Sequence, residues 1–453
     1  MKKRTGLYVI VCVLAAAVLG AVLYLRVSDG TAAEPTPEPT PEVAAIDVGG
    51  TEFSADVEAL ELDGVPYSFD ALCAAKDSFT ELAAIWLGQS VSYPSDKADI
   101  ARLRAAYPDA ELHFDVDISG VKHDCAEETL DLSAALASGK LSQALDVLDA
   151  FPALREINLI PSSGDQTLLD LDTLRALTDA VPWVKLNAAF ELFGQIVSSN
   201  DEKIIFDNID IGDAGLDTLR LVMPHLNCSY FQISDCGIEN EQLAELRDEF
   251  PERNVVWRVY IYDYPFMTDC HRVRTVHIDS VTCEVLKYCT EVRYIDLGHN
   301  MYINNCDFVA YMPHLQSAIL GLTAITDISP LANCKELQFL ELHRSNISDI
   351  SVLSGLTSLE YLNIGGMPEL TDLSPLFNLT GLKVIRIVSD PQISTEQIEE
   401  LQQHLPDTTF LLEGWAPHMN GWRYDDDGNI TEWYARLREQ MDYDDDTAYT
   451  DIR

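Results

Sequence analysis

Two short motifs place a cysteine beside a histidine and an aspartate, the residue types of nucleophilic and metal sites. They are His123-Asp124-Cys125 and Asp269-Cys270-His271. A nucleophilic cysteine needs a base that is oriented by a third group, and a metal needs further ligands at matching spacing. Both motifs lie in irregular connections, and nothing in the sequence places such partners beside them. We therefore interpret both as loop segments.

An acidic run near the C-terminus, Asp425-Asp426-Asp427-Gly428-Asn429, has a superficial likeness to a calcium loop. An EF-hand loop requires glycine at its sixth position and glutamate at its twelfth. Counted from Asp425, those positions hold Ile430 and Arg436. The sequence also lacks a Walker loop, a nucleophile elbow and paired catalytic carboxylates. We therefore predict no enzymatic activity, no catalytic residue, no bound metal and no cofactor.

The chain has ten cysteines, none in the CxxC spacing of metal sites. Cys12 lies in an apolar N-terminal run. Cys289 and Cys334 each lie three residues before the first apolar position of a predicted strand. Other predicted strands place Met312, Leu356 and Leu379 there. This equivalence favours buried, apolar thiols, and it leaves a few disulfides open.

Charge and composition narrow the classes of partner. Asp and Glu number 74 against 30 Lys and Arg, a formal net charge of -44. Such a surface repels phosphate backbones, so nucleic acid is excluded as a partner. Hydrophobic residues make up 47% of the chain, enough to build a core. Cationic partners, or solubility outside the cell, fit this balance.

The N-terminus predicts a membrane anchor. Residues 1–5 carry Lys2, Lys3 and Arg4, and residues 6–25 carry no charge. A run of this length crosses a hydrocarbon core of about 30 Å, and the basic flank keeps the N-terminus in the cytoplasm. We expect a single-pass transmembrane signal anchor at 6–26, a Pro/Thr/Glu stalk at 27–50 and an extracellular domain beyond it. Cleavage near Thr31-Ala32-Ala33 remains the alternative.

Apolar residues then recur at a fixed spacing of 22 or 23 positions. The pattern LxxLxLxxN is matched by Val292, Ile295, Leu297 and Asn300; by Leu315, Ala318, Leu320 and Thr323; by Leu337, Leu340, Leu342 and Ser345; by Leu359, Leu362 and Ile364; and by Leu382, Ile385, Ile387 and Asp390. One such unit cannot bury its own apolar face, whereas stacked units form a continuous core with short parallel strands.

This pattern resembles the 22-residue leucine-rich repeats of internalin-like bacterial surface proteins. It departs from them at the ninth position, where Thr323, Ser345 and Asp390 stand in place of asparagine. Side-chain hydrogen bonding along that column is therefore expected to be weaker. The resemblance implies an α/β fold, a right-handed leucine-rich-repeat solenoid, or horseshoe, with parallel concave strands. One transmembrane helix is expected to precede it.

Longer and less regular repeats fill residues 51–291. Their connectors are predicted helices, and most end at an apolar residue followed by proline, which cannot extend a helix. The helices are expected at 96–106, 142–150, 171–180, 215–222 and 240–249. A module of roughly 70 residues, with an additional alternating strand segment, occurs about three times. Regular repeats occupy 292–392. Residues 393–453 form the expected C-terminal cap, with a last helix near 431–441.

Residues between the apolar positions of each strand project from the concave face, because side chains alternate along a strand. On the first strand of the regular sheet we expect Thr275, His277 and Asp279 in these rows. Exposed aromatic residues beside mixed charges favour a ligand surface, although cross-strand packing is the alternative. The predicted ligand-binding residues are Tyr294, Asp296, Phe339, Glu341, His343, Tyr361, Asn363 and Arg386.

The predicted function is extracellular binding or adhesion, with a protein ligand recognised at the concave face. The alternative is a structural organiser of the cell envelope that is tied to wall polymers and has no catalytic role. Both predictions involve a protein or envelope partner and attachment to the cell membrane. Repeat solenoids serve many functions, so the fold does not identify the ligand.

Overall fold

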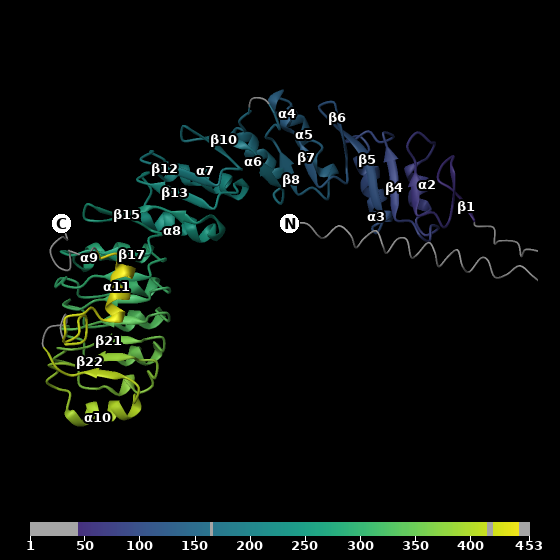
Figure 1. Ribbon diagram of the computed structural model, residues 1–453. Helices are drawn as coiled ribbons and strands as arrows, with labels where there is room; N and C mark the ends of the chain where they lie inside the picture. The colour runs from purple at the N-terminus through teal and green to yellow at the C-terminus, as the bar shows by residue number, and fades with distance from the viewer. Residues whose placement is uncertain (1–43, 164–165, 415–419, 444–453) are drawn as a thin grey trace, which may run out of the picture. The chain divides into compact units, whose positions relative to one another are not determined.

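The computed structural model describes residues 44–163, 166–414 and 420–443 (Figure 1). These residues divide after Phe114 into two compact units. The predicted transmembrane helix at 6–26 and most of the predicted stalk lie outside the described residues.

The described residues contain no helix that is both long enough and apolar enough to cross a bilayer. The predicted fold class is therefore corrected in one respect. An α/β repeat architecture is present, but the structure does not provide the transmembrane helix that was expected to precede it. The longest helix described, α7 (Gly212–Val222), has 11 residues, whereas a span requires about 20.

The first unit is a short parallel sheet with helical connections. A hairpin of β1 (Ala45–Asp47) and β2 (Glu52–Ser54) precedes it. Strands β3 (Ala59–Glu61), β4 (Ala84–Gly88) and β5 (Glu111–Ile118) then pair in parallel. Helices α2 (Phe69–Ala74) and α3 (Lys97–Ala106) connect these strands. Buried Leu60 and Ile85 lie opposite each other in the register and help to form the core.

The second unit continues the same alternation with two further three-stranded parallel sheets. One comprises β7 (Thr129–Asp131), β8 (Glu156–Asn158) and β9 (Lys185–Asn187). The other comprises β12 (Lys203–Asp207), β13 (Tyr230–Ser234) and β14 (Val255–Val256).

An antiparallel hairpin accounts for the additional strand segment of each 70-residue module. β5 turns back as β6 (Val121–Asp124), β10 (Ala189–Leu192) pairs with β11 (Gln195–Ser198), and β15 (Arg258–Ile261) pairs with β16 (Tyr264–Met267). Each hairpin lies at or directly after the third strand of its block. The module is therefore three parallel strands followed by one hairpin.

The predicted helices are confirmed, with small differences at their ends. α6 (Leu171–Ala180) and α8 (Asn240–Glu249) match their predicted bounds, and α7 begins three residues early. The segment predicted as one helix at 142–150 instead forms α5 (Leu141–Leu145) and a short 3-10 helix, η1 (Leu148–Ala150). Before them lies another short helix, α4 (Ser133–Ala137), which the sequence pattern did not indicate.

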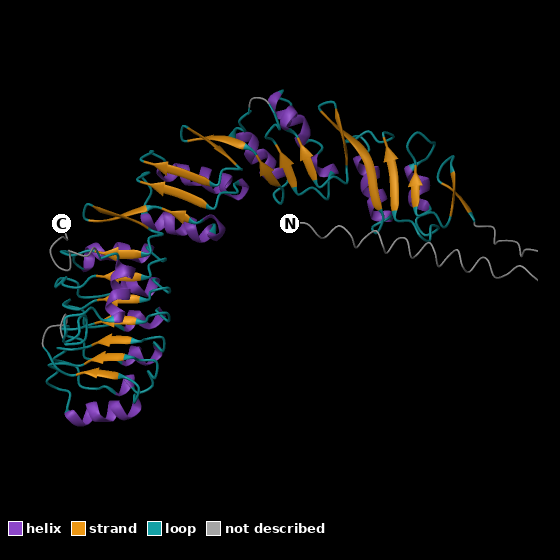
Figure 2. Ribbon diagram, in the orientation of Figure 1, coloured by secondary structure: helices purple, strands orange, loops and turns teal. Residues whose placement is uncertain are grey.

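The regular repeats form a seven-stranded parallel sheet in sequence order (Figure 2). Its strands are β17 (Arg272–Arg274), β18 (Tyr294–Asp296), β19 (Ser317–Ile319), β20 (Phe339–Glu341), β21 (Tyr361–Asn363), β22 (Val384–Arg386) and β23 (Thr409–Leu411). The central position of each strand points into the repeat interior, where Ile295, Ala318, Leu340, Leu362 and Ile385 are buried. The predicted spacing of these five strands is confirmed.

Short helices close each regular repeat on the side away from the strands. They are mostly 3-10 turns: η4 (Glu284–Tyr288), which follows α9 (Ser280–Cys283), then η5 (Asp307–Tyr311), η6 (Ser329–Asn333), η7 (Ser351–Gly355) and η8 (Ser374–Leu376). A turn of this size fits the space that a 22-residue unit leaves after its strand. Upstream repeats are longer, and this allows full α-helices at the same place.

The predicted register of β17 is wrong. Val273 lies opposite Ile295, and the carbonyl of His271 accepts hydrogen bonds from the amides of Arg293 and Tyr294. The residues of β17 that point outward are therefore Arg272, beside Tyr294, and Arg274, beside Asp296. Thr275, His277 and Asp279 instead belong to the turn that follows, and His277 has a positive φ of 62°.

The ninth position of the repeat shows why asparagine matters there. Asn300 donates to the carbonyls of Thr275 and Leu297, both at 2.9 Å, and so connects two repeats. Thr323 and Ser345 donate only to the carbonyl three residues earlier, at 2.7 Å. The weaker hydrogen bonding expected along this column is confirmed for these two residues.

The C-terminal region has two separate parts. α10 (Thr395–His404) and β23 complete the stack, as a cap should. The chain then returns, and α11 (Glu432–Met441) packs against β18. Figure 1 shows α11, in yellow, lying across the strands that follow β17. The predicted last helix is therefore present, but it covers the concave face of the sheet and not its end.

Candidate functional site

The predicted ligand-binding residues lie together on the outward face of β18, β20, β21 and β22, or just beyond the end of β20. We call this the concave face. It is not open to solvent, because the C-terminal segment, residues 420–443, lies on it. Phe339, Glu341, His343, Asn363 and Arg386 are all less than 5% exposed, whereas Tyr294, Asp296 and Tyr361 are partly buried. Whether these residues also contact a ligand stays a prediction.

Aromatic side chains form the apolar part of this contact. The ring of Phe339 lies 5.5 Å from that of Trp422, and Tyr361 stacks on Trp433 at the same centroid distance. One buried cluster joins strand residues to the C-terminal segment; it consists of Ile319, Phe339, Val384, Trp422, Tyr434, Leu437 and Met441. The aromatic row of the repeats therefore packs against a second layer of the same chain.

A buried ion pair lies at the centre of the contact. Glu341 is fully buried; its carboxylate accepts a hydrogen bond from the indole Nε1 of Trp422 and a 2.8 Å hydrogen bond from Arg423. Burial opposes ionisation, but Arg423, His343 and Trp422 outweigh it and hold the pKa of Glu341 below its ordinary value. The site therefore contains a carboxylate that stays charged.

Further polar contacts fix the position of α11. The Tyr443 hydroxyl donates to Asp296, and Ser317 donates to the side chain of Gln440 at 3.0 Å. Arg272 donates to the Gln440 carbonyl at 2.6 Å and pairs with Asp442 at 3.2 Å. These contacts involve β17, β18 and β19, so the segment is held along several repeats.

Small residues make room for the largest polar side chains of the concave face. A Cβ atom on Gly321 would lie 2.3 Å from the His343 ring, and one on Gly365 would lie 2.6 Å from the Arg386 guanidinium. His343 Nδ1 is 3.7 Å from the Glu341 carboxylate, outside hydrogen-bonding distance. Arg386 donates to the Gly414 carbonyl at 2.7 Å. Any larger residue than glycine at 321 or 365 would therefore collide with the polar side chain of the next repeat.

Burial determines the charge state of His343. It lowers the pKa of this imidazole to about 4; Arg423, His299 and Arg386 act in the same direction, and Glu341 opposes them. His343 is therefore neutral near pH 7. Burial also raises the pKa of Asp390 to about 6, against the backbone hydrogen bonds that it accepts. Asp390, at the ninth position of its repeat, thus titrates in mildly acidic solution.

The two cysteine motifs have different surroundings. His123 lies 3.2 Å from Glu127 within its own connection, and Cys125 is buried. Cys270 is partly exposed, just before β17. The Asp425 carboxylate accepts from the amides of Asp427 and Asn429 and closes a tight turn. Within the described ranges no group of three or more His, Cys, Asp or Glu side chains could hold a metal ion.

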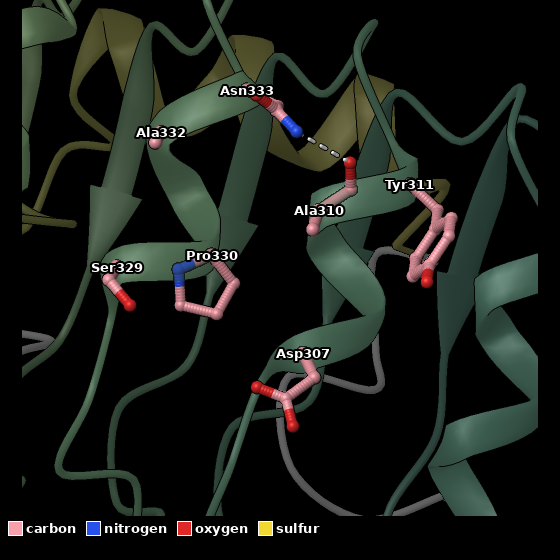
Figure 3. Close-up of a pocket in the computed structure, with 7 residues that line it drawn as sticks. All are labelled: Asp307, Ala310, Tyr311, Ser329, Pro330, Ala332 and Asn333. Carbon is pink, nitrogen blue, oxygen red and sulfur yellow. Dashed lines mark hydrogen bonds between the residues drawn. The ribbon is translucent and has the colours of Figure 1, made fainter.

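A hollow of about 570 Å³ lies on the opposite side of the repeats, between η5 and η6 (Figure 3). Its lining residues are Asp307, Ala310, Tyr311, Ser329, Pro330, Ala332 and Asn333. Asn333 donates to the carbonyl of Ala310 at 3.1 Å, so its amide serves to connect two repeats. Asp307 is the one charged residue of this lining. The hollow therefore results from repeat stacking and offers little catalytic chemistry.

Sequence reasoning missed the residues that cover the concave face. Trp422, Arg423 and Tyr443 were assigned only to a terminal cap. A signal was present, because Tyr434, Leu437 and Met441 recur at the spacing of one helical face. A helix with such a stripe requires an apolar partner surface. The aromatic row that the sequence predicts, Tyr294, Phe339 and Tyr361, offers such a surface.

The first prediction concerns the buried ion pair. Glu341→Gln removes the carboxylate that Arg423 contacts at 2.8 Å, which should weaken docking of the C-terminal segment by roughly 3–5 kcal/mol. Hydrogen exchange read by mass spectrometry should show faster exchange in residues 420–443. Replacing both partners, Glu341→Leu with Arg423→Met, should restore much of the protection. Unchanged exchange in Glu341→Gln would show that the pair does not hold the segment.

The second prediction concerns pH. The His343 pKa is about 4 in the folded protein, below its ordinary value of 6.5. Unfolded chains therefore bind more protons between these values, and stability falls as pH drops from 6.5 towards 4. The loss should be on the order of 3 kcal/mol. Urea unfolding at pH 7 and pH 4.5 should show a smaller loss for His343→Gln than for wild type. Equal losses would contradict a buried, neutral imidazole.

Comparison with known proteins agrees with the repeat pattern. Residues 335–378 match the family model described as "Leucine Rich repeats (2 copies)". No curated protein matches the chain.

Solved structures similar to the chain include an internalin from Listeria monocytogenes, at 20% identity over 77% of this chain and 82% of that one, with a TM-score of 0.30. Internalin C2 from the same species has 25% identity over 32% and 72%, with a TM-score of 0.25. A leucine-rich-repeat protein from Leptospira interrogans has 14% identity over 79% and 96%, with a TM-score of 0.29. The predicted resemblance is confirmed: a leucine-rich-repeat model matches residues 335–378, and internalins are among the solved structures similar to the chain.

Proposed function

We propose that this protein is a non-catalytic recognition protein whose ligand is a protein segment, bound at the concave face of β18–β22. The observation that carries the proposal is the contact between Glu341 and the pair formed by Trp422 and Arg423. The same residues that the repeat pattern assigned to ligand contact bind a peptide segment of their own chain. This supports the view that the face is suited to bind protein.

The contacts also indicate the chemistry of the ligand. Glu341 accepts from an indole N–H and from a guanidinium, while Phe339 and Tyr361 pack against aromatic rings. A ligand that replaces the C-terminal segment must offer an aromatic side chain beside a cationic one. Burying Glu341 under a segment without such donors would leave a charge unpaired at a cost of several kcal/mol. The C-terminal segment thus acts as a competitor that is part of the chain.

We test this with a labelled synthetic peptide of residues 420–443 as the probe. In the full chain, Trp422→Ala with Arg423→Ala should weaken the internal contact and allow saturable binding of the peptide. Adding Glu341→Gln should weaken that binding by about 2 kcal/mol or more, the scale of an interface hot spot. Fluorescence anisotropy measures both.

The matched control is Lys335→Ala, whose ammonium donates to the Gly355 carbonyl at the end of η7; it should leave peptide binding unchanged. Recognition also requires that the internal segment open in the wild-type chain. Residues 420–443 should therefore exchange amide hydrogens faster than β18–β22 under native conditions. Equal exchange would indicate a permanent structural layer and would reject the recognition proposal.

We further propose that the repeat domain is displayed outside the cell. The net charge of -44 and the Pro- and Thr-rich residues 35–41 support this localisation. Protease added to intact cells should then degrade the repeat domain while a cytoplasmic marker survives. A domain that stays intact until the cells are lysed would reject external display. Retention of the purified protein by isolated cell wall alone would instead favour a structural role in the envelope.

A further inference from the structure

Exposed apolar side chains gather where the last hairpin of the long repeats meets the first regular repeats. Tyr262, in the turn between β15 and β16, is 55% exposed, and Val281 of α9 is 81% exposed. Met301 and Tyr302, which follow β18, are 69% and 77% exposed. We call these four residues the tyrosine patch. A gathering of large exposed apolar groups marks an interaction site in many soluble proteins.

Contacts around Asp279 join the three segments that carry the tyrosine patch. The hydroxyl of Tyr262 donates to the Asp279 carboxylate at 3.4 Å, and Asp279 pairs with Tyr302 in a parallel β-bridge. Beside it, the hydroxyl of Ser280 donates to the side chain of Asn304 at 2.7 Å and accepts from the amide of Asn304 at 2.8 Å. The hairpin turn, the start of α9 and the loop after β18 therefore form one surface.

The backbone at Tyr262 has a conformation that a bulky residue rarely adopts. Its φ is 52°, in the left-handed region. Phe193, in the turn between β10 and β11, has a similar φ of 51°, but its ring packs edge-to-face against Phe206 at 5.4 Å. Tyr262 instead keeps more than half of its surface exposed, so packing does not account for an aromatic residue at this turn. Backbone strain of this kind gathers at functional sites.

The charges beside the tyrosine patch favour a cationic partner. Residues 260–264, 277–283 and 299–305 contain Asp263 and Asp279 but no lysine or arginine. An acidic partner would therefore meet like charge here. A second copy of this chain is disfavoured for the same reason, because its net charge is -44.

Tyrosine rings of this chain accept arginine elsewhere in the molecule. The guanidinium of Arg274 lies 4.5 Å from the ring centre of Tyr443, and that of Arg423 lies 5.1 Å from the ring centre of Tyr434. A guanidinium can stack its face on a ring and direct its edge to a carboxylate, whereas an ammonium is a compact, strongly hydrated point charge. At the tyrosine patch, exposed rings lie beside the Asp279 carboxylate, the combination that suits arginine best.

We propose that the tyrosine patch binds an arginine-rich segment of another protein. Arginine side chains of the partner stack on Tyr262 and Tyr302, and the carboxylates of Asp263 and Asp279 supply the opposite charge. The two aliphatic residues of the patch contact the apolar stems of these arginines. The patch lies on the turns that follow the strands and on the hairpin, so it is separate from the outward face of β18–β22 and independent of the function proposed for that face.

The test uses the full chain and a labelled peptide of alternating arginine and glycine, with binding read by fluorescence anisotropy. Binding should be saturable and should weaken as salt is added. A lysine-glycine peptide of the same length and charge should bind at least about fivefold more weakly, because arginine stacks better on a ring. Tyr262→Ala with Tyr302→Ala should weaken binding of the arginine peptide about tenfold or more. These changes leave the net charge unaltered, so diffuse attraction to an acidic chain stays the same.

Tyr311→Ala is the matched control. Tyr311 lies on η5, away from the strands, and its exposure of 55% equals that of Tyr262, so binding should stay at wild-type strength. Tyr262→Phe with Tyr302→Phe keeps both rings and should retain most of the binding.

Three outcomes would overturn the proposal. Equal affinity for the lysine peptide, or equal weakening by Tyr311→Ala, would show that bulk charge alone attracts the peptide. Displacement of the arginine peptide by an unlabelled peptide of residues 420–443 would place the binding on the concave face. A chain that binds neutral oligosaccharides through Tyr262 and Tyr302, but not the arginine peptide, would make the patch a sugar platform instead.

Discussion

Glu341 sits at the centre of the concave face with no exposure to solvent. A carboxylate in that position is costly unless it is paired and hydrogen-bonded. Its partners, Trp422 and Arg423, come from a segment more than 80 residues further along the chain. The sheet and the C-terminus therefore depend on each other: without the segment Glu341 would be solvated, and without Glu341 Arg423 would lose the carboxylate that it contacts at 2.8 Å.

This dependence changes the character of the sheet. The inward positions pack into the repeat core, as in any stacked array. In addition, Ile319, Phe339 and Val384 on the outward side belong to a second buried cluster with α11. The middle repeats are thus covered on both faces of the sheet. A layer of this kind stabilises those repeats, yet it also shields the surface on which a repeat protein would bind its partner.

Much of this fold could be predicted from the sequence, because its determinants are local or periodic. The spacing of 22 or 23 residues fixed β18–β22, and apolar-proline pairs marked several helix ends. β17 was misplaced because Thr275, His277 and Asp279 were assigned to its outward rows, although Val273 lies 22 residues before Ile295 and takes the inward position. The rows of Tyr294, Phe339 and Tyr361 face outward as predicted. The C-terminal segment that covers these residues could not be predicted from the repeat pattern, since its position depends on contacts between segments far apart in sequence.

The polarity of the concave face limits what can replace the C-terminal segment. Asp296 and Glu341 present acceptors, Arg386 is engaged by the Gly414 carbonyl, and Phe339 and Tyr361 present rings. An acidic ligand would face like charge at Glu341, and a purely apolar one would leave that carboxylate without donors. Both penalties are larger than the gain from one additional aromatic contact. Discrimination at this surface therefore comes more from the cost of an unpaired Glu341 than from the area that a ligand buries.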